Sequence, residues 1–281
     1  MRIRSHVAFN FGKDFMVYQG SEALLRKLIQ FAVPYVKRLE FSDSEDKWYD
    51  VVFNILSKES NQKYLLIHGL PAVNDKVRTA LTNMVDKGVL IGFKKIKTIV
   101  VFELPPCNFQ CLTVEPDPES EWRFLKYIKC SFRTFYFPIT EFCFIDENLG
   151  LSWRIPDVFI VDYVQEIYSA HIPHYYCKME IFNFLKRIFP NANTLFIDLD
   201  PNCKTLIEYY ENDTAEIKEA ISQAPQENIH ILWQIYPVED EKKLITAFDG
   251  KKIGDNTFEW KMDSNEKKTI KLQFLEKPLG H

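Results

Sequence analysis

The chain is predicted to fold as an α/β protein built from repeated helix–proline–strand units, and three observations support this. Apolar residues recur at intervals of three and four in some segments and of two in others, as in helices and strands respectively. Prolines follow several expected helices and end them, because proline lacks an N–H and its ring blocks the next turn. Hydrophobic residues make up 46% of the 281 residues, which allows an extended core.

The first part of the chain is expected to alternate regularly between helices and strands. Ser21 is placed to cap the first helix, and Pro34 follows that helix. Asn74 is placed to cap another helix, which Gly88 would end as its C-cap. Residues 97–104 show the clearest strand pattern of the chain, and two prolines stop it. The expected helices are 22–31, 48–56 and 74–87, and the expected strands are 36–41, 63–68 and 97–104.

The rest of the chain begins with a less regular segment. Residues 119–129 look helical, residues 133–145 are aromatic and rich in strand-forming residues, and residues 156–176 favour a strand through their β-branched side chains. Order returns after residue 178. The expected helices there are 179–189 and 213–224, the latter capped by Asp213; the strands are 194–199 and 229–236; and a hairpin joins 257–262 to 269–275 through the polar loop 263–268.

Three segments share one design, in which an amphipathic helix leads to a proline and then to a strand. The prolines are Pro34, Pro190 and Pro225. The pattern Pro-x4-Leu-x-[Phe/Ile] holds for the first two, and the third strand starts one residue sooner. Right-handed crossovers would then build either an open doubly wound sheet or a curved solenoid. The alternative, that this order recurs by chance in any α/β protein, stays open.

The length of one unit favours a leucine-rich-repeat-like arrangement. The length of a unit falls at the upper end of the usual repeat length of about 20–29 residues or exceeds it. The regular leucine ladder and the glycine fingerprint of a dinucleotide-binding half are both missing. We therefore expect an irregular leucine-rich-repeat-like solenoid or open sheet. It would form one elongated domain over residues 1–281, subdivided into N-terminal repeats 1–110, an irregular middle 111–178 and C-terminal repeats 179–281 with the terminal hairpin.

Composition and charge argue against several classes of protein. The net charge of −4 disfavours a nucleic acid partner, which needs a cationic excess or patch. The N-terminus lacks the apolar stretch of a signal peptide, and no run approaches 18 apolar residues, so no membrane partner is expected. The six cysteines are too sparse for a disulfide scaffold and are expected to be free thiols. The expected location is the cytoplasm or the nucleus.

Asp198 and Asp200 are the first candidates for catalytic chemistry. They lie at the end of the expected strand 194–199, where haloacid-dehalogenase-like phosphatases hold a nucleophile and an acid around magnesium. However, Pro-Asn-Cys follows the pair instead of the Thr or Val that those enzymes prefer. Residues 253–256 come too soon to be their second metal-binding loop. A metal-dependent hydrolase is therefore the alternative, and a solvated strand-to-loop turn is the favoured interpretation.

Close spacing of His171, His174 and Cys177 gives a second candidate site, for zinc. Structural zinc needs four ligands, usually as two separated pairs. Cys107 and Cys111 would supply the second pair. The aromatic neighbours of these residues favour a packed region over a metal site.

Two isolated features carry weaker signals. His68 ends an expected strand, where α/β enzymes place catalytic groups, but a satisfied polar residue is the favoured interpretation. Lys94, Lys95 and Lys97 form a small basic spot, which we interpret as a solvated turn. No Gly-x-Ser-x-Gly elbow and no Walker lysine loop occur in the sequence. We therefore assign no catalytic, cofactor-binding or metal-ligating residue and expect no cofactor.

Residues 179–198 read Met-Glu-Ile-Phe-Asn-Phe-Leu-Lys-Arg-Ile-Phe-Pro-Asn-Ala-Asn-Thr-Leu-Phe-Ile-Asp, a helix followed by Phe-Pro-Asn-Ala and a Leu-x-Ile strand. Residues 34–41 look like an earlier copy, and residues 258–275 look similar to a closing hairpin. This pattern resembles the nematode F-box proteins with F-box-associated or leucine-rich-repeat-like regions. The resemblance implies a binding module without catalytic residues. An F-box itself is a three-helix module with a Leu-Pro entry, and residues 1–20 contain nothing like it.

The sequence and the resemblance together predict a non-enzymatic protein–protein interaction module, the substrate-recognition part of an F-box-type ubiquitin ligase adaptor. Its partner is expected to be a protein, with a Skp1-type adaptor only if an F-box exists upstream. Two alternatives stay open. One is the metal-dependent hydrolase centred on Asp198 and Asp200, and the other is an orphan paralogue with a purely structural role.

Overall fold

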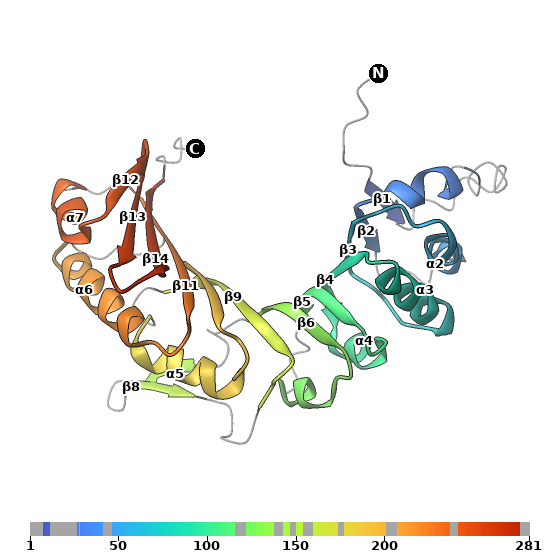
Figure 1. The fold of residues 1–281 in the computed structure, drawn as a ribbon, viewed down its shortest axis with the longest axis horizontal. Coiled ribbons are helices and arrows are strands. Elements are labelled where there is room, and N and C mark those ends of the chain that lie inside the picture. The colour runs from blue at the N-terminus through green and yellow to red at the C-terminus, as the bar shows by residue number, and fades with distance from the viewer. Residues whose placement is uncertain are drawn as a thin grey trace. The chain divides into compact units, whose positions relative to one another are not determined.

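In the computed structural model the chain forms two compact units, Met1–Phe135 and Tyr136–His281 (Figure 1). Each unit combines a sheet with helices, so the predicted α/β class is confirmed. The boundary between the units falls inside the segment 111–178. The structure describes residues 8–11, 27, 29–41, 47–115, 122–137, 143–146, 150–153, 160–173, 177–200, 207–236 and 241–275.

The N-terminal unit holds a sheet whose neighbouring strands follow one another in chain order, from β1 to β6. The pairs from β1 to β5 are parallel. Right-handed crossovers between such neighbours put every helix on one face, and α2, α3 and α4 share one side of this sheet in Figure 1. The elements are β1 (Ala8–Phe11), η2 (Val33–Tyr35), β2 (Arg38–Phe41), α2 (Lys47–Glu59), β3 (Tyr64–His68), α3 (Asp75–Asp86), β4 (Leu90–Lys97), α4 (Thr98–Glu103), β5 (Asn108–Glu115), η3 (Trp122–Tyr127) and β6 (Ser131–Tyr136).

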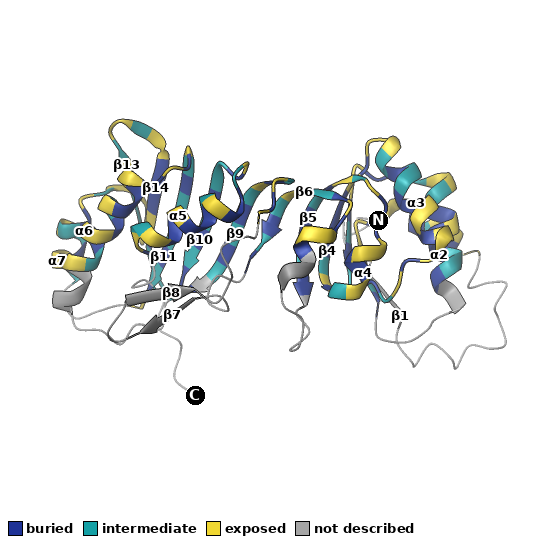
Figure 2. Ribbon diagram, turned by 90° about the horizontal axis from the view of Figure 1, so that it is seen from below, coloured by how far each residue is buried: buried dark blue, intermediate teal, exposed yellow. Residues whose placement is uncertain are grey.

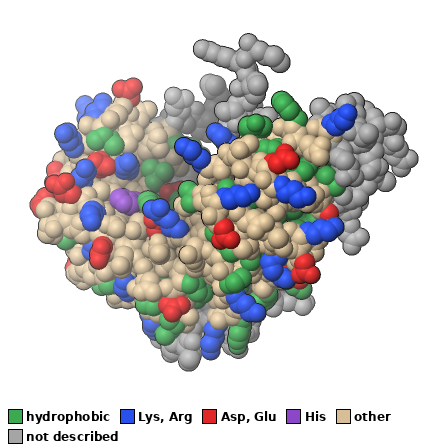
Figure 3. All heavy atoms as spheres, turned by 45° about the vertical axis from the view of Figure 1, so that its right-hand side comes forward, with side chains coloured by type: hydrophobic (Ala, Val, Ile, Leu, Met, Phe, Trp, Pro, Cys, Tyr) green, Lys and Arg blue, Asp and Glu red, His purple; other side chains and the backbone are tan. Residues whose placement is uncertain are grey.

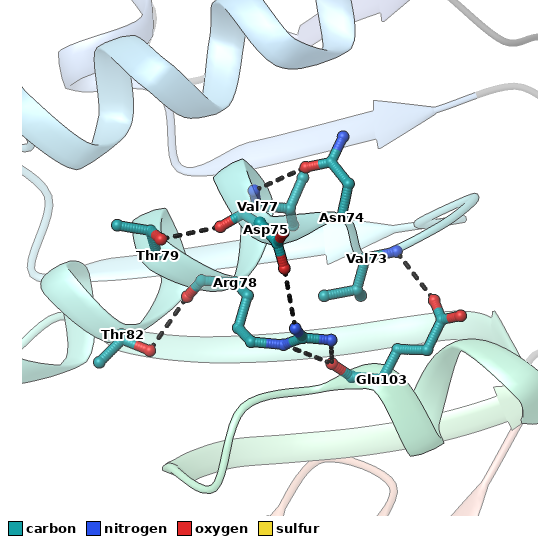
Figure 4. A network of polar contacts seen from close by, with 8 residues as sticks. All are labelled: Val73, Asn74, Asp75, Val77, Arg78, Thr79, Thr82 and Glu103. Atoms are coloured by element: carbon teal, nitrogen blue, oxygen red, sulfur yellow. Dashed lines mark hydrogen bonds and ion pairs between the residues drawn. The ribbon is translucent and has the colours of Figure 1, made fainter.

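Helix α3 has the boundaries that its sequence signals predict. The Asn74 side chain accepts a hydrogen bond from the backbone N–H of Val77 at 3.0 Å and so caps the helix (Figure 4). Gly88 follows the helix with φ at +80°, and its N–H donates back into the last turn. Val77 and Leu81 are fully buried. The helix predicted for 74–87 is therefore confirmed.

The strand predicted for residues 97–104 is wrong, because Thr98–Glu103 form helix α4 and strand β4 lies just before it. Strand β4 pairs with β3 on one side and with β5 on the other. The sheet therefore has no strand position left between β4 and β5 for residues 98–103. Val100 is buried in the helix, and Arg78 of α3 donates to the Glu103 carbonyl at the helix end (Figure 4). These tertiary contacts outweigh the strand propensity of the β-branched residues.

The C-terminal unit holds a sheet in the order β9-β10-β11-β14-β13-β12. Strands β9, β10, β11 and β14 run parallel, and β13 and β12 continue the sheet as antiparallel strands. Helices α5, α6 and α7 lie on one side of this sheet in Figure 1. The elements are β7 (Cys143–Asp146), β8 (Gly150–Trp153), β9 (Val164–Ile172), α5 (Met179–Ile188), β10 (Thr194–Leu199), α6 (Ile207–Gln223), β11 (Asn228–Ile235), α7 (Glu241–Phe248), β12 (Lys251–Gly254), β13 (Thr257–Met262) and β14 (Asn265–Phe274).

Among the described residues, no helix has both the length and the apolar character needed to cross a membrane.

Strands β7 and β8 pair as an antiparallel hairpin of their own.

Most elements predicted for the C-terminal unit are confirmed within one or two residues, namely α5, β10, β11 and the hairpin strand β13. The helix predicted from Asp213 begins earlier, at Ile207, so Asp213 lies inside the helix. A residue type that often caps helices is also tolerated in a helix interior. The helix predicted for 119–129 is a shorter 3₁₀ helix, η3. Helix α7 and strand β12 were not predicted from the sequence.

The polar loop predicted for residues 263–268 is also wrong, since β14 already begins at Asn265. The reason is the buried side chain of Lys268. Its Nζ donates to the carbonyls of Ile221 at 3.0 Å and Ala224 at 2.7 Å, at the C-terminal end of α6. Carbonyls at a helix end lack partners within the helix. The charged residue is thus a structural link between sheet and helix, whereas the local pattern suggested a solvated loop.

The helix–proline–strand order is found at all three predicted sites. Pro34 lies in η2 before β2, Pro190 lies between α5 and β10, and Pro225 lies between α6 and β11. Ser21 and most of the helix expected over 22–31 lie outside the described residues.

A buried glutamine has the same role in both units. Gln62 lies just before β3 and donates through Nε2 to the Val33 carbonyl at 2.7 Å. Gln226 lies just before β11 and donates to the Phe182 carbonyl at 2.8 Å. Each amide therefore joins one helix–strand unit to the unit before it, and its buried NH₂ group finds an acceptor there.

Replacing Lys268 by methionine is expected to destabilise the protein by about 1–3 kcal/mol, because the Ile221 and Ala224 carbonyls both lose the ammonium donor and the Ile221 carbonyl keeps only the Ala224 N–H. The matched control is Lys267→Met at the exposed neighbouring position. It should change the free energy of unfolding by less than about 0.5 kcal/mol. Urea unfolding followed by circular dichroism measures both variants, and equal stabilities would contradict the role given to Lys268.

Candidate interaction surface

The two faces of the C-terminal sheet differ in what covers them. The ring of Phe137 packs against that of Phe189, directly after α5, with centroids 5.2 Å apart. The Lys218 ammonium of α6 lies over the ring of Trp260 on β13 at 5.4 Å. Lys268 reaches α6 from β14. The face that carries these side chains is therefore the one that the helices cover.

Alternate residues on the central strands point to the opposite face. Along β10 and β11 buried residues alternate with half-buried ones, because successive side chains of a strand point to opposite faces (Figure 2). No described helix lies over this second face in Figure 1, and we name it the open face. It carries Tyr168 on β9, Phe196 and Asp198 on β10, His230, Leu232 and Gln234 on β11, Thr269, Lys271 and Gln273 on β14, and Glu259 and Lys261 on β13.

Aromatic side chains form a row across the open face. In the strand register Phe196 lies directly beside Tyr168 on one side and beside His230 on the other. The rings of Phe196 and His230 stack with centroids 5.1 Å apart and planes 21° apart. The ring of Tyr168 contacts that of Tyr136 at 4.8 Å. Neighbouring strands are about 4.8 Å apart, so in-register rings on parallel strands are brought into contact by the sheet itself.

A carboxylate lies beside this row. Asp198 follows Phe196 by two residues on β10, and one of its oxygens accepts a hydrogen bond from the Tyr168 hydroxyl. Burial raises the pKa of Tyr168 well above its usual value, and the hydrogen bond and the negative charge of Asp198 raise it further. The phenol is therefore the donor in this pair.

The other half of the open face carries both signs of charge. Glu259 on β13 lies 3.4 Å from the Lys261 ammonium and 3.8 Å from that of Lys271. Half-exposed ion pairs of this kind contribute little to stability. Figure 3 shows one side of the molecule, on which cationic and anionic side chains are mixed rather than gathered into one cationic block.

His230 lies between the two halves. Its Nδ1 is 3.1 Å from the Thr269 hydroxyl on β14. Burial lowers the pKa of His230, the neighbouring charge of Lys271 lowers it further, and Glu259 opposes both. The imidazole is therefore neutral at pH 7.

The two residues of the hydrolase hypothesis lie at the end of β10. Asp198 is on the open face and bonds Tyr168, whereas the backbone N–H of Asp200, just past β10, donates to the Ile172 carbonyl at 2.8 Å. Residues 253–256 include the turn between β12 and β13. Among the described residues, no group of three or more His, Cys, Asp or Glu is placed to hold a metal ion.

The zinc hypothesis concerns residues that are only partly described. His171 is in β9 but its side chain is not described, and His174 lies outside the described residues. Cys177 is a buried free thiol, and burial raises its pKa to about 12. Cys107 and Cys111 are free thiols in the N-terminal unit.

The Cys111 thiol occupies the space left by the missing side chain of Gly92. A Cβ at Gly92 would lie 2.5 Å from the Cys111 sulfur and 3.2 Å from the Tyr64 hydroxyl. Burial raises the pKa of Cys111 above its usual value. Of the remaining cysteines, Cys130 is a buried free thiol, the side chain of Cys143 is not described and Cys203 lies outside the described residues.

His68 and the predicted basic spot lie at the ends of β3 and β4. His68 Nδ1 is 3.9 Å from the Glu40 carboxylate, and the strand register places Lys94 beside His68. Lys95 has φ at +50°, where β4 changes register with β5. Glu40, His68 and Lys94 therefore form a polar row across β2, β3 and β4, and the turn predicted for the basic spot is wrong because Lys94, Lys95 and Lys97 belong to strand β4.

Comparisons with models of protein families, with curated proteins and with solved structures found no match. The argument for function therefore depends on the open face. Of its residues, only Asp198 was singled out from the sequence. The period-two alternation along 194–199 and 229–236 was visible, but the residues that share a row depend on cross-strand register, which one sequence does not give.

Replacing His230 by asparagine is expected to reduce the pH dependence of stability. As pH falls below about 6.5, the unfolded chain binds a proton at this histidine while the folded protein resists it, so the free energy of unfolding decreases. The variant has no such group. Urea unfolding at about pH 7.5 and pH 5.5 should show a larger loss for the native sequence than for His230→Asn. An equal loss in both would contradict the assignment.

Proposed function

We propose that this chain is a non-enzymatic protein–protein interaction module with an irregular leucine-rich-repeat-like solenoid architecture, and that the open face binds its protein partner. The observation that carries the proposal is the open face itself. Rows of aromatic, amide and charged side chains cross parallel strands there, and no described helix lies over them.

The sheet gives this surface the rigidity that recognition requires. Each row is held by backbone pairing between neighbouring strands, and several of its side chains are linked, such as Gln234 Nε2 to Gln273 Oε1 at 3.0 Å. Side chains that are already ordered lose less conformational entropy when a partner binds. Repeat proteins in general use such extended surfaces for binding.

The strand order supports the solenoid architecture. In the N-terminal unit each strand pairs with the next in the chain, and the same holds from β9 to β11. A doubly wound sheet would instead reverse its order at one point and place helices on both faces. The glutamines Gln62 and Gln226, which join successive helix–strand units, support a repeated design.

The sequence resemblance to F-box proteins supports a more specific role. In that role the chain is the substrate-recognition part of an F-box-type ubiquitin ligase adaptor, and a Skp1-type adaptor binds only if an F-box lies upstream. The alternatives are a metal-dependent hydrolase using Asp198 and Asp200, and an orphan paralogue with a structural role.

Two variants test whether the open face is the binding surface. The double variant His230→Ala/Gln234→Ala changes two open-face residues of β11, and Lys242→Ala changes an exposed residue of α7. Affinity purification from cell extract with quantitative mass spectrometry should show proteins that bind the native chain and Lys242→Ala equally. Their recovery should fall about tenfold or more with the double variant.

Two results would contradict the proposal. One is an identical set of recovered proteins with all three chains. The other is hydrolysis of a phosphate ester by the purified protein in the presence of magnesium, abolished by Asp198→Asn, which would establish the hydrolase instead.

A further inference from the structure

We propose that the open face binds an arginine side chain of its protein partner, at a site made by Asp198, Tyr168, Phe196 and His230. This site is named the guanidinium site below. The inference rests on the proposed function and specifies the chemistry of the partner.

The first observation is a carboxylate without a cation. Asp198 accepts the hydrogen bond of the neutral Tyr168 hydroxyl, and no described Lys or Arg forms an ion pair with it. The strand register places Leu232, and then Lys271, in the same row as Asp198. Lys271 is thus two strands away, roughly 9.6 Å, and it pairs with Glu259 at 3.8 Å. The negative charge of Asp198 is therefore available to a ligand.

The second observation is the capacity of this carboxylate. An ionised carboxyl group has two oxygens with about four acceptor positions, and the Tyr168 hydroxyl uses one of them. The remaining positions suit the two parallel N–H groups of a guanidinium. Because burial and Asp198 raise the pKa of Tyr168, the phenol remains a donor and fixes the orientation of the carboxylate.

The third observation is the aromatic row next to the carboxylate. Phe196 precedes Asp198 by two residues on the same face of β10, between Tyr168 and His230 in the register. The imidazole of His230 is neutral at pH 7 and does not repel a cation. Half-exposed rings attract guanidinium groups by cation–π contact and stacking.

These features select arginine over lysine. A lysine ammonium is a compact, strongly hydrated charge that pairs with a carboxylate at one point and gains little from stacking. A guanidinium is planar, less hydrated and able to pair with the carboxylate and lie against an aromatic ring at the same time. The partner should therefore present an arginine at the contact with β9 and β10.

The test uses the full chain and two synthetic peptides of equal length and charge, in which glycine and serine separate either five arginines or five lysines. Fluorescence anisotropy measures both affinities at about pH 7.5. The arginine peptide should bind about tenfold tighter than the lysine peptide. Asp198→Asn should remove this preference, because the amide can still accept the Tyr168 hydrogen bond but carries no charge.

A matched control separates the site from the general charge of the protein. Asp255→Asn removes one negative charge at the exposed turn between β12 and β13 and should leave the preference unchanged. Phe196→Leu keeps the apolar volume without the ring and should lower the affinity for the arginine peptide. Equal binding of the two peptides to the native chain, or equal effects of Asp198→Asn and Asp255→Asn, would overturn the guanidinium site.

The outcomes distinguish this inference from the proposed function. If recovery of partners depends on His230 and Gln234 but Asp198→Asn leaves it unchanged, the open face binds a protein and the guanidinium site is wrong. If recovery is unchanged in all variants and no arginine preference exists, both proposals are wrong.

Discussion

The parallel pairing of successive strands is the constraint on which the rest of the structure depends. Within the N-terminal unit, and from β9 to β11, each strand pairs with the next one along the chain. Right-handed crossovers between such neighbours place every connecting helix on the same side. One face of each strand must therefore be apolar to receive the helices, and the other face is left to other side chains. The alternation along Asn228–Ile235 shows this division most clearly.

The connections between successive units are held by a few buried polar groups. Gln62, Gln226 and Lys268 each donate to backbone carbonyls that lie far away in the sequence. Such groups cost free energy on burial unless they are paired. They therefore also specify which helix–strand unit packs against which within each compact unit. The open face follows from the same arrangement, because in-register strands bring Tyr168, Phe196 and His230 into one row.

The sequence predicted the elements better than it predicted the surface. Residues 194–199 were assigned correctly because a proline, a turn and strict alternation agree there. Residues 97–104 were assigned wrongly, because the helix depends on the contact of Arg78 with the Glu103 carbonyl and on the pairing of β4 with β3 and β5, and neither can be read from this segment alone. The bond between Tyr168 and Asp198 joins residues 30 positions apart, and no pattern within either strand indicates it.

Hydroxyl-radical footprinting read by mass spectrometry tests the central claim most directly, which is that the helices cover one face of the C-terminal sheet and leave the other accessible. Along β11, the open-face residues His230 and Leu232 should be oxidised in the native protein. Ile231 and Trp233, which face the helices, should be protected until the protein is unfolded. Equal protection of all four residues would show that another layer covers the open face and would contradict the account.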